Sequence, residues 1–134
     1  MRSTFSEAEA AFVRWARVAR LATVGPDGLP HVVPVCPVLD EDGRIIVCLE
    51  KGSVKHRNAA ADPRVALIFD DYREDWDANA AVLVRGRAEF LEGEAWERAR
   101  GLLYEKFLQY QPLAEISDDP IVAIAPEHVA GWGL

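Results

Sequence analysis

The sequence predicts a mainly β protein, specifically a mostly antiparallel barrel with peripheral helices. The candidate strands are short and closely spaced, which is typical of antiparallel barrels. Few segments are suited to act as crossover helices between parallel strands, which argues against a doubly wound sheet. The 134 residues suit a single domain over residues 1–134, and they contain no internal repeat or low-complexity tract.

The first part of the chain predicts one helix followed by three antiparallel strands. Ser6 with Glu9 three residues later is a capping-box pattern, which begins a helix that we expect to end at about Arg17. Because Pro34 and Pro37 lack the N–H that a sheet ladder needs, the strand that contains them should lie at an edge or carry bulges. The three strands are expected over residues 21–24, 31–38 and 44–49.

The rest of the chain predicts two more helices and four more strands. A short helix begins at Ser53 and ends near Ala61, before an Asp-Pro pair. The continuous apolar run over 65–69 predicts a strand that is buried on both faces. The segment 82–91 alternates, which predicts a strand with one face on a core and one charged face. The last elements are expected over residues 94–108, 121–125 and 129–132, a long helix and two short strands.

Composition excludes several classes of protein. The 22 acidic against 15 basic residues give a net charge of −7, the wrong sign for a nucleic-acid binder. No apolar run approaches the ~20 residues of a membrane span. Cys36 and Cys48 lack CxxC spacing and no signal-like region follows Met1, so we expect a cytoplasmic protein whose thiols pack as small hydrophobes. The three histidines show no metal-ligand spacing, so no metal site is expected.

The sequence also lacks the motifs of two common enzyme classes. There is no GxSxG motif, P-loop or GxGxxG motif, and the glycine-rich pieces are turn sequences. Nucleophilic hydrolases and Rossmann-type enzymes are therefore not supported.

The most informative segment is Lys51-Gly52-Ser53-Val54-Lys55-His56-Arg57-Asn58, which holds two of the three lysines of the chain. Cations, a hydroxyl and the free N–H groups of a helix start are expected to converge there. Such an arrangement suits an anion, and a phosphate ester matches its geometry. The alternative interpretation is an ordinary helix cap with solvated charges.

Two other features also have two interpretations. Arg85 and Arg87 share the outward face of their strand, where they either bind an anionic ligand or are simply paired with Glu89 or Glu92 or solvated. Trp132 stands between two glycines near the end of the chain, where its ring either packs on the core or forms a wall against a planar cofactor.

Three segments, in order along the chain, carry a resemblance to a known family. The segments RVARLATVGPDGLPHVVPVCPV (17–38), KGSVKHRNAAADPR (51–64) and VRGRAEFLE (84–92) resemble the opening hairpin, the phosphate-binding segment and the following strand of split β-barrel flavin and deazaflavin oxidoreductases. The resemblance extends over nearly the whole chain. It is nearest to the pyridoxamine 5'-phosphate oxidase-like, FMN-binding class, in the branch of probable coenzyme F-420-dependent enzymes.

The resemblance implies a homodimer with one cofactor per subunit, bound in grooves at the shared interface. Ser53, Lys55 and Arg57 match the phosphate-contacting segment of the family, with Gly52 and Asn58 beside them. The family's ring site corresponds in this sequence to Val33, Pro34, Val35 and Cys36, which would run beside the ring, and to Trp132, which would close the pocket.

The implied activity is a reductase that uses the deazaflavin F-420 to transfer hydride to a small conjugated substrate. The resemblance supplies no general acid, because the redox ring performs the chemistry, so no catalytic side chain is assigned. Pyridoxamine-phosphate oxidase activity itself is not expected, because those enzymes are longer and have further substrate-binding arginines. The alternatives are an FMN-dependent oxidoreductase of the same fold, a non-catalytic flavin-binding or carrier protein, and a small barrel without a cofactor.

Overall fold

The computed structural model describes residues 2–108, 110 and 115–134, and within them the chain forms three α-helices, one short 3-10 helix and seven strands. The helices are α1 (Glu7–Trp15), α2 (Val54–Ala61) and α3 (Gly93–Lys106), with the 3-10 helix η1 over Trp76–Ala78. The strands are β1 (Ala19–Val24), β2 (Pro30–Val35), β3 (Val38–Leu39), β4 (Ile45–Cys48), β5 (Arg64–Asp71), β6 (Ala80–Phe90) and β7 (Ile121–Trp132).

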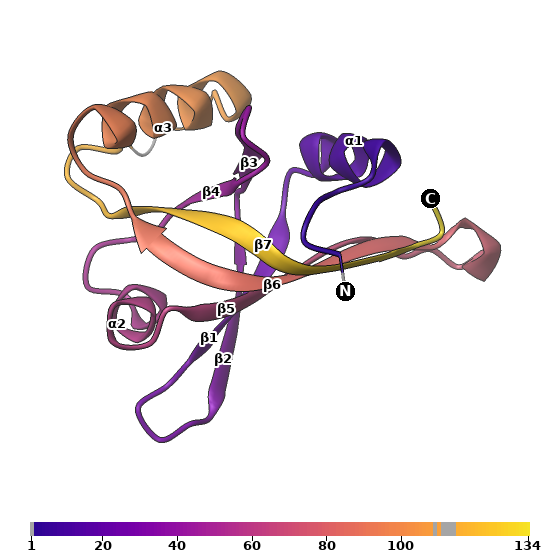
Figure 1. Cartoon of the computed structure of the whole chain (residues 1–134), viewed down its shortest axis with the longest axis horizontal. Coiled ribbons are helices and arrows are strands. Elements are labelled where there is room, and N and C mark those ends of the chain that lie inside the picture. The colour runs from indigo at the N-terminus through magenta and orange to yellow at the C-terminus, as the bar shows by residue number, and fades with distance from the viewer. Residues whose placement is uncertain (1, 109, 111–114) are drawn as a thin grey trace.

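The seven strands form one antiparallel sheet in the order β2-β1-β5-β6-β7-β4-β3. The long strands β6 and β7 run side by side across the molecule, from the neighbourhood of α2 to the C-terminus (Figure 1). β2 and β3 lie at opposite edges of the sheet, yet only residues 36 and 37 connect them. The sheet must therefore curl until its two edges come close, which makes it an incompletely closed barrel.

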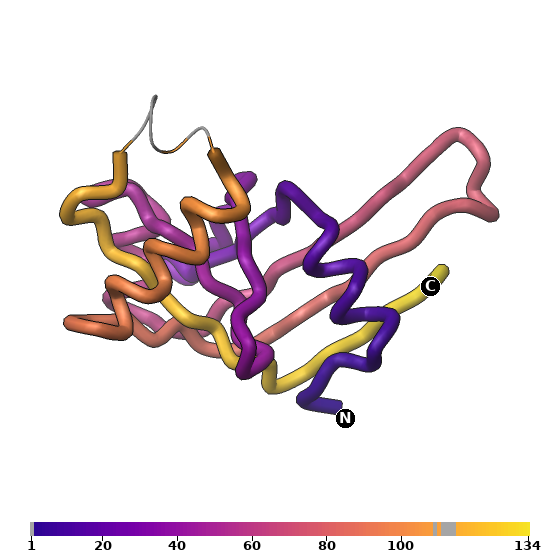
Figure 2. The backbone as a smooth tube through the Cα atoms, turned by 90° about the horizontal axis from the view of Figure 1, so that it is seen from above, coloured from indigo at the N-terminus to yellow at the C-terminus, as the bar shows by residue number. Residues whose placement is uncertain are grey.

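The curled sheet encloses one hydrophobic core, and α3 covers a second. The first core includes Leu21 of β1 and Phe69 of β5, both buried. The second lies between α3 and the strands β4 and β7, and includes Ile46, Leu103 and Ile121. The tube in Figure 2 shows α3 lying over one end of the sheet, separate from α1. The helices α1 and α3 therefore cover two different parts of the sheet.

The structure confirms a mostly antiparallel barrel with peripheral helices. The capping box is present, since Ser6 Oγ accepts from the Glu9 N–H at 3.1 Å and the Glu9 carboxylate accepts from the Ser6 N–H at 2.8 Å. β2, which contains Pro34, is an edge strand, as its prolines predict. The charged, exposed face of β6 is also confirmed, with Arg85 and Arg87 on it.

The prediction that the strand over 65–69 is buried on both faces is wrong. Val65, Leu67 and Phe69 are buried, whereas Ala66 and Ile68 are only half-buried. The first face contacts the core inside the curled sheet, and the second receives only partial cover. A continuous apolar run therefore does not distinguish full from partial burial of the outer face.

Three strand predictions also need correction. The strands expected over 121–125 and 129–132 are one continuous strand, β7, because Pro126 lies at a β-bulge where the register with β6 shifts. The strand expected over 31–38 is two strands, since the chain leaves β2 before Pro37 and begins β3 after it. The third expected strand, β4, pairs with β3 and β7 rather than β2.

No helix within the described ranges is both long enough and apolar enough to cross a bilayer.

Candidate functional site

The turn before α2 and the first turn of this helix form a hydrogen-bond network around Gly52. Gly52 has a φ of +81°, a left-handed conformation that glycine adopts without the steric cost of a Cβ. Its N–H donates to Nδ1 of His56 at 3.0 Å, and Nη1 of Arg57 donates to its carbonyl at 2.6 Å. Ser53 is the N-cap, and its Oγ accepts from the His56 N–H at 3.3 Å. The side chains of α2 thus hold its own entrance in place.

Three cations flank this entrance, and they differ in how their charges are used. Nζ of Lys51 lies 2.9 Å from Oδ2 of Asp118, and this exposed pair raises the pKa of Lys51. Arg57 is exposed and donates one N–H to the Gly52 carbonyl. It forms no ion pair with the described residues. Half-buried Lys55 forms neither a hydrogen bond nor an ion pair within the described part of the chain. Lys55 and Arg57 therefore retain donors for an external anion.

Backbone donors add to these cations. The first turn of an α-helix leaves N–H groups without intrahelical partners, and at α2 the Ser53 side chain satisfies that of His56. The N–H groups of Val54 and Lys55, the first two helical residues, remain for a ligand. The positive end of the helix and the two cations together fit the phosphate of a nucleotide-like cofactor.

Asn58 lies at the site but points away from the solvent. It is buried, and its Nδ2 donates to Oγ1 of Thr23 in β1 at 3.1 Å. Asn58 therefore joins α2 to β1. This contact fixes the position of the helix that carries Lys55 and Arg57.

Cys36, Cys48 and Tyr110 all pack against the second core. Burial raises the pKa of Cys48 to about 12, Asp119 acts in the same direction, and Lys55 opposes both. Burial raises the pKa of Tyr110 to about 12, with contributions from Cys36 and Cys48. Both thiols are free, half-buried and packed against the second core, which confirms that they act as small hydrophobes.

The residues predicted to run beside the ring do not share one face. Val33 is half-buried against the first core, Val35 is buried, and Pro34 between them is exposed. Cys36 packs against the second core. On the exposed face of β2 a ligand would meet Pro34 and its exposed neighbour Val32, with the other residues behind them.

Trp132 lies far from the α2 entrance. It pairs with Ala81, whereas Phe90 at the other end of β6 contacts the His56 ring at a centroid distance of 5.9 Å. At about 3.3 Å per residue, the length of β6 between them corresponds to about 30 Å. Nε1 of Trp132 donates to the Tyr72 hydroxyl at 3.0 Å. The side chain of Trp132 is therefore engaged with the segment after β5 and not with α2. One copy of the chain does not bring Trp132 to Lys55.

The two strand arginines lie on the exposed face of β6. Nε of Arg87 lies 3.4 Å from Oε2 of Glu127, so the acidic partner comes from the bulge of β7 and not from the expected Glu89 or Glu92. Arg85 is exposed on the same face. The register places both arginines on the strand pair β6–β7.

Sequence reasoning assigned no role to His56, although its side chain secures Gly52. The available signal is spacing, because His56 follows the N-cap Ser53 by three residues, where a capping box has Glu or Gln. Here, however, Nδ1 of His56 accepts from the N–H of Gly52, one residue before the N-cap, while the Ser53 N–H donates to the Glu50 carbonyl.

Comparisons with known proteins identify relatives in sequence and in fold. The chain is 31% identical to 5a,11a-dehydrotetracycline/5a,11a-dehydrooxytetracycline reductase from Streptomyces rimosus, with 97% of this chain and 84% of the relative covered. The solved structure of conserved hypothetical protein Rv2991 from Mycobacterium tuberculosis has a TM-score of 0.83 at 30% identity, covering 96% of this chain and 85% of that one. A FAD-binding protein from Mesorhizobium loti has a TM-score of 0.73 at 26% identity, covering 95% and 94%.

A family model also matches almost the entire chain. The model, described as pyridoxamine 5'-phosphate oxidase, matches residues 5–133. This match includes the hairpin, the α2 entrance and the long strands, which are the segments that carried the resemblance in the sequence. The chain therefore belongs to the pyridoxamine 5'-phosphate oxidase-like family of split-barrel proteins.

Proposed function

We propose that this protein is an oxidoreductase that holds a deazaflavin, coenzyme F-420, by its phosphate at the entrance of α2 and reduces a small conjugated substrate. Membership of an oxidase-like family and the relative named as a dehydrotetracycline reductase support redox chemistry. The FAD-binding structural neighbour supports a flavin-type cofactor. The observation that carries the proposal is the pair of available cations, Lys55 and Arg57, at the α2 entrance.

Each part of the entrance has a defined task in this proposal. Lys55 supplies a point charge, Arg57 supplies a planar donor pre-oriented by Gly52, and the first N–H groups of α2 supply directed hydrogen bonds. The exposed face of β2 at Pro34 supports the flat ring. When bound, the cofactor supplies hydride, and the chain positions the ring and shields it from water.

A second copy of the chain would complete the site. Because Trp132 is remote from α2 within one copy, it can act as a wall only in the site of another copy. The proposed functional unit is therefore a homodimer. The exposed Trp132, Tyr72 and Trp76 provide apolar surface for such a contact.

FMN in place of F-420 is the nearest alternative, because both cofactors share the ribityl phosphate that the entrance would hold. A non-catalytic carrier is the other alternative. Side-by-side fluorescence titrations with FMN and F-420 distinguish the cofactors. A carrier would leave the oxidation rate of the reduced cofactor by a conjugated acceptor no higher than in free solution, whereas a reductase would raise it.

The double variant Lys55→Ala/Arg57→Ala tests the phosphate assignment. Charge-assisted hydrogen bonds contribute ~1.5 to 3 kcal/mol each, so the double variant should bind cofactor at least about 100-fold more weakly. Fluorescence titration measures the change. Lys51→Ala is the matched control, because Lys51 belongs to the same segment but is paired with Asp118, and it should bind almost as the parent does. Parental affinity in a folded double variant would show that the phosphate lies elsewhere.

A further inference from the structure

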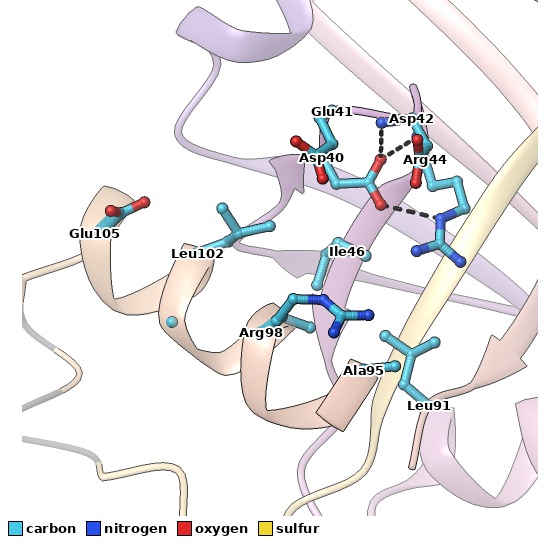
Figure 3. A pocket seen from close by; sticks show the side chains of 12 residues that line it. Asp40, Glu41, Asp42, Arg44, Ile46, Leu91, Ala95, Arg98, Leu102 and Glu105 are labelled. Carbon is cyan, nitrogen blue, oxygen red and sulfur yellow. Dashed lines mark hydrogen bonds and ion pairs between the residues drawn. The ribbon is translucent and has the colours of Figure 1, made fainter. Parts of the chain in front are cut away.

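A second concave site lies between α3 and the turn that joins β3 to β4. Its volume is about 380 Å³, which is within the range of small-molecule sites. Figure 3 shows the side chains of α3 and of the turn facing one another across it. The floor is apolar and is formed by side chains of β4, of the segment after β6 and of α3, namely Ile46, Leu91, Ala95, Ala99 and Leu102.

This pocket does not belong to the proposed cofactor site. None of its lining residues lies in α2, in β2 or at Trp132. Phe90, at the end of β6, contacts His56 of α2, while the next residue, Leu91, lines the pocket. Consecutive side chains of an extended chain point to opposite sides, so the two sites lie on opposite faces of the sheet.

The rim of the pocket is predominantly acidic. Asp40 is neutralised within the turn, because its carboxylate accepts from the backbone N–H groups of Asp42 and Arg44 and pairs with Nε of Arg44 at 2.9 Å. The carboxylates of Glu41, Asp42 and Glu105 have no partner among the described residues.

Two cations line the pocket: Arg44, whose charge is paired with Asp40, and Arg98. Arg98 is exposed, and its charge is shared with Glu94 at 4.0 Å. The rim therefore carries a net negative charge, in a protein that is itself acidic.

Gly101 lines the pocket without a side chain. It lies well inside α3, where glycine costs roughly 1 kcal/mol relative to alanine. A Cβ built at Gly101 would meet no atom within 4 Å, so close packing of the fold does not require glycine there. The missing side chain instead leaves room on the wall of the pocket.

We propose that this pocket binds a small organic cation with an apolar body, such as an aromatic amine. The apolar floor accommodates the body, and the carboxylates of Glu41, Asp42 and Glu105 attract the cationic group. An organic anion of the same shape is disfavoured, because the lining carboxylates outnumber the two lining arginines, Arg44 and Arg98. The site is separate from the α2 entrance, so its occupation does not depend on the proposed cofactor.

Tryptamine and indole-3-propionate form the matched pair of probes, since they share an indole body and differ in the sign of the charge. Each is titrated into the 15N-labelled full chain while the backbone signals of Ile46, Gly101 and Leu102 are followed by NMR. Tryptamine should shift these signals saturably, and indole-3-propionate should not. No saturable shift with tryptamine, or equal shifts with both probes, would overturn the proposal. A second copy covering the pocket would also abolish the shift and would overturn it.

Variants of the rim and wall sharpen the test. Asp42→Asn with Glu105→Gln should weaken tryptamine binding at least about threefold, and Arg98→Gln should strengthen it, because it removes the opposing charge. Gly101→Leu should abolish binding, whereas Gly101→Ala, which adds one methyl group and favours the helix, should keep it. If Gly101→Leu does not fold, the test depends on the charge variants. Unchanged tryptamine affinity both in Asp42→Asn with Glu105→Gln and in Arg98→Gln would contradict the cation assignment. Titration of each variant with the cofactor that the parent binds, F-420 in our proposal, should remain parental.

Discussion

Lys106 shows how one side chain can join three parts of this fold. Its Nζ donates to the Ala16 carbonyl at 2.6 Å and to the Pro37 carbonyl at 2.8 Å, so the end of α3 is fastened to the end of α1 and to the β2–β3 link. The ammonium also lies 5.2 Å from the centre of the Phe107 ring. Burial lowers the pKa of Lys106 to about 8, and the neighbouring Arg17 acts in the same direction.

We expect a direct titration to find this shift. The chain has three lysines, so 13C-lysine labelling gives three Cε signals that single substitutions assign. The signal of Lys106 should titrate near pH 8, and that of Lys51, whose pKa its partner Asp118 raises, should titrate above pH 10.5. A Lys106 signal that titrates with an ordinary lysine pKa would refute the assignment.

The same shift has a defined effect on stability. The folded pKa of Lys106, about 8, is below the unfolded value of 10.5, so the unfolded chain binds more protons between these pH values. The contribution of Lys106 to the free energy of unfolding should therefore rise from pH 8 to pH 10.5. Urea unfolding of the parent and of Lys106→Met should diverge in this direction over that interval. Parallel pH profiles would contradict it.

At the scale of elements, α2 depends on a buried polar contact with β1. Asn58 and Thr23 are 5% and 2% exposed, and their side chains are hydrogen-bonded to each other. α2 has little apolar surface of its own, since Ala59 is the buried apolar residue of the helix. The orientation of the proposed phosphate site therefore depends on this contact as well as on packing.

A double-mutant cycle measures the contact. Asn58→Ala leaves the Thr23 hydroxyl buried without its partner, so it should lower the free energy of unfolding by about 1–3 kcal/mol. Thr23→Val with Asn58→Ala should cost less than the sum of the single changes, as expected for coupled residues. Urea unfolding gives the free energies, and Ser3→Ala, an exposed change outside this contact, is the control. Additive effects would mean that the two side chains are not coupled.

Most elements were predictable because their signals are local. The capping box of Ser6, the Asp-Pro stop after Ala61 and the alternation of β6 each depend on a few neighbouring residues. The pairing of β4 with β7 was not predictable, because it joins segments about 75 residues apart in the chain. The continuity of β7 through Pro126 was missed because a proline in a bulge has the same local signal as one at a strand end.

The candidate sites were predictable to different degrees. The α2 segment stood out because lysines are rare in this chain and two of them flank a helix start. The α3 pocket gave no comparable signal, since its walls come from residues 40–46 and 91–105, and each segment alone reads as ordinary surface. Gly101 was the one local irregularity that could have indicated it.

At the scale of the whole molecule, the remoteness of Trp132 from α2 makes the proposed site a property of two chains. We expect sedimentation equilibrium to give about twice 14.9 kDa. A monomer that binds cofactor with parental affinity would contradict the shared site.

Mixing two defective variants tests the shared site directly. Lys55→Ala/Arg57→Ala impairs the phosphate end, and Trp132→Ala impairs the ring wall. In a mixed dimer with a shared site, one of the two sites combines the intact halves, so refolding the variants together should restore tight binding in part. Fluorescence titration of the mixture against each variant measures this. No recovery in a confirmed mixed dimer would place Trp132 outside the site.

The prolines of β2 also restrict how copies of this protein can assemble. In an antiparallel pair, alternate residues direct their N–H groups away from the partner strand, and Pro34 is best accommodated in that outward set. Pro30 and Val32 belong to the same outward set. Because Pro30 and Pro34 have no N–H, Val32 is the residue of this set that can donate a hydrogen bond outward. Another strand would find almost no backbone donors along this border, which protects the chain against open-ended polymerisation through strand addition.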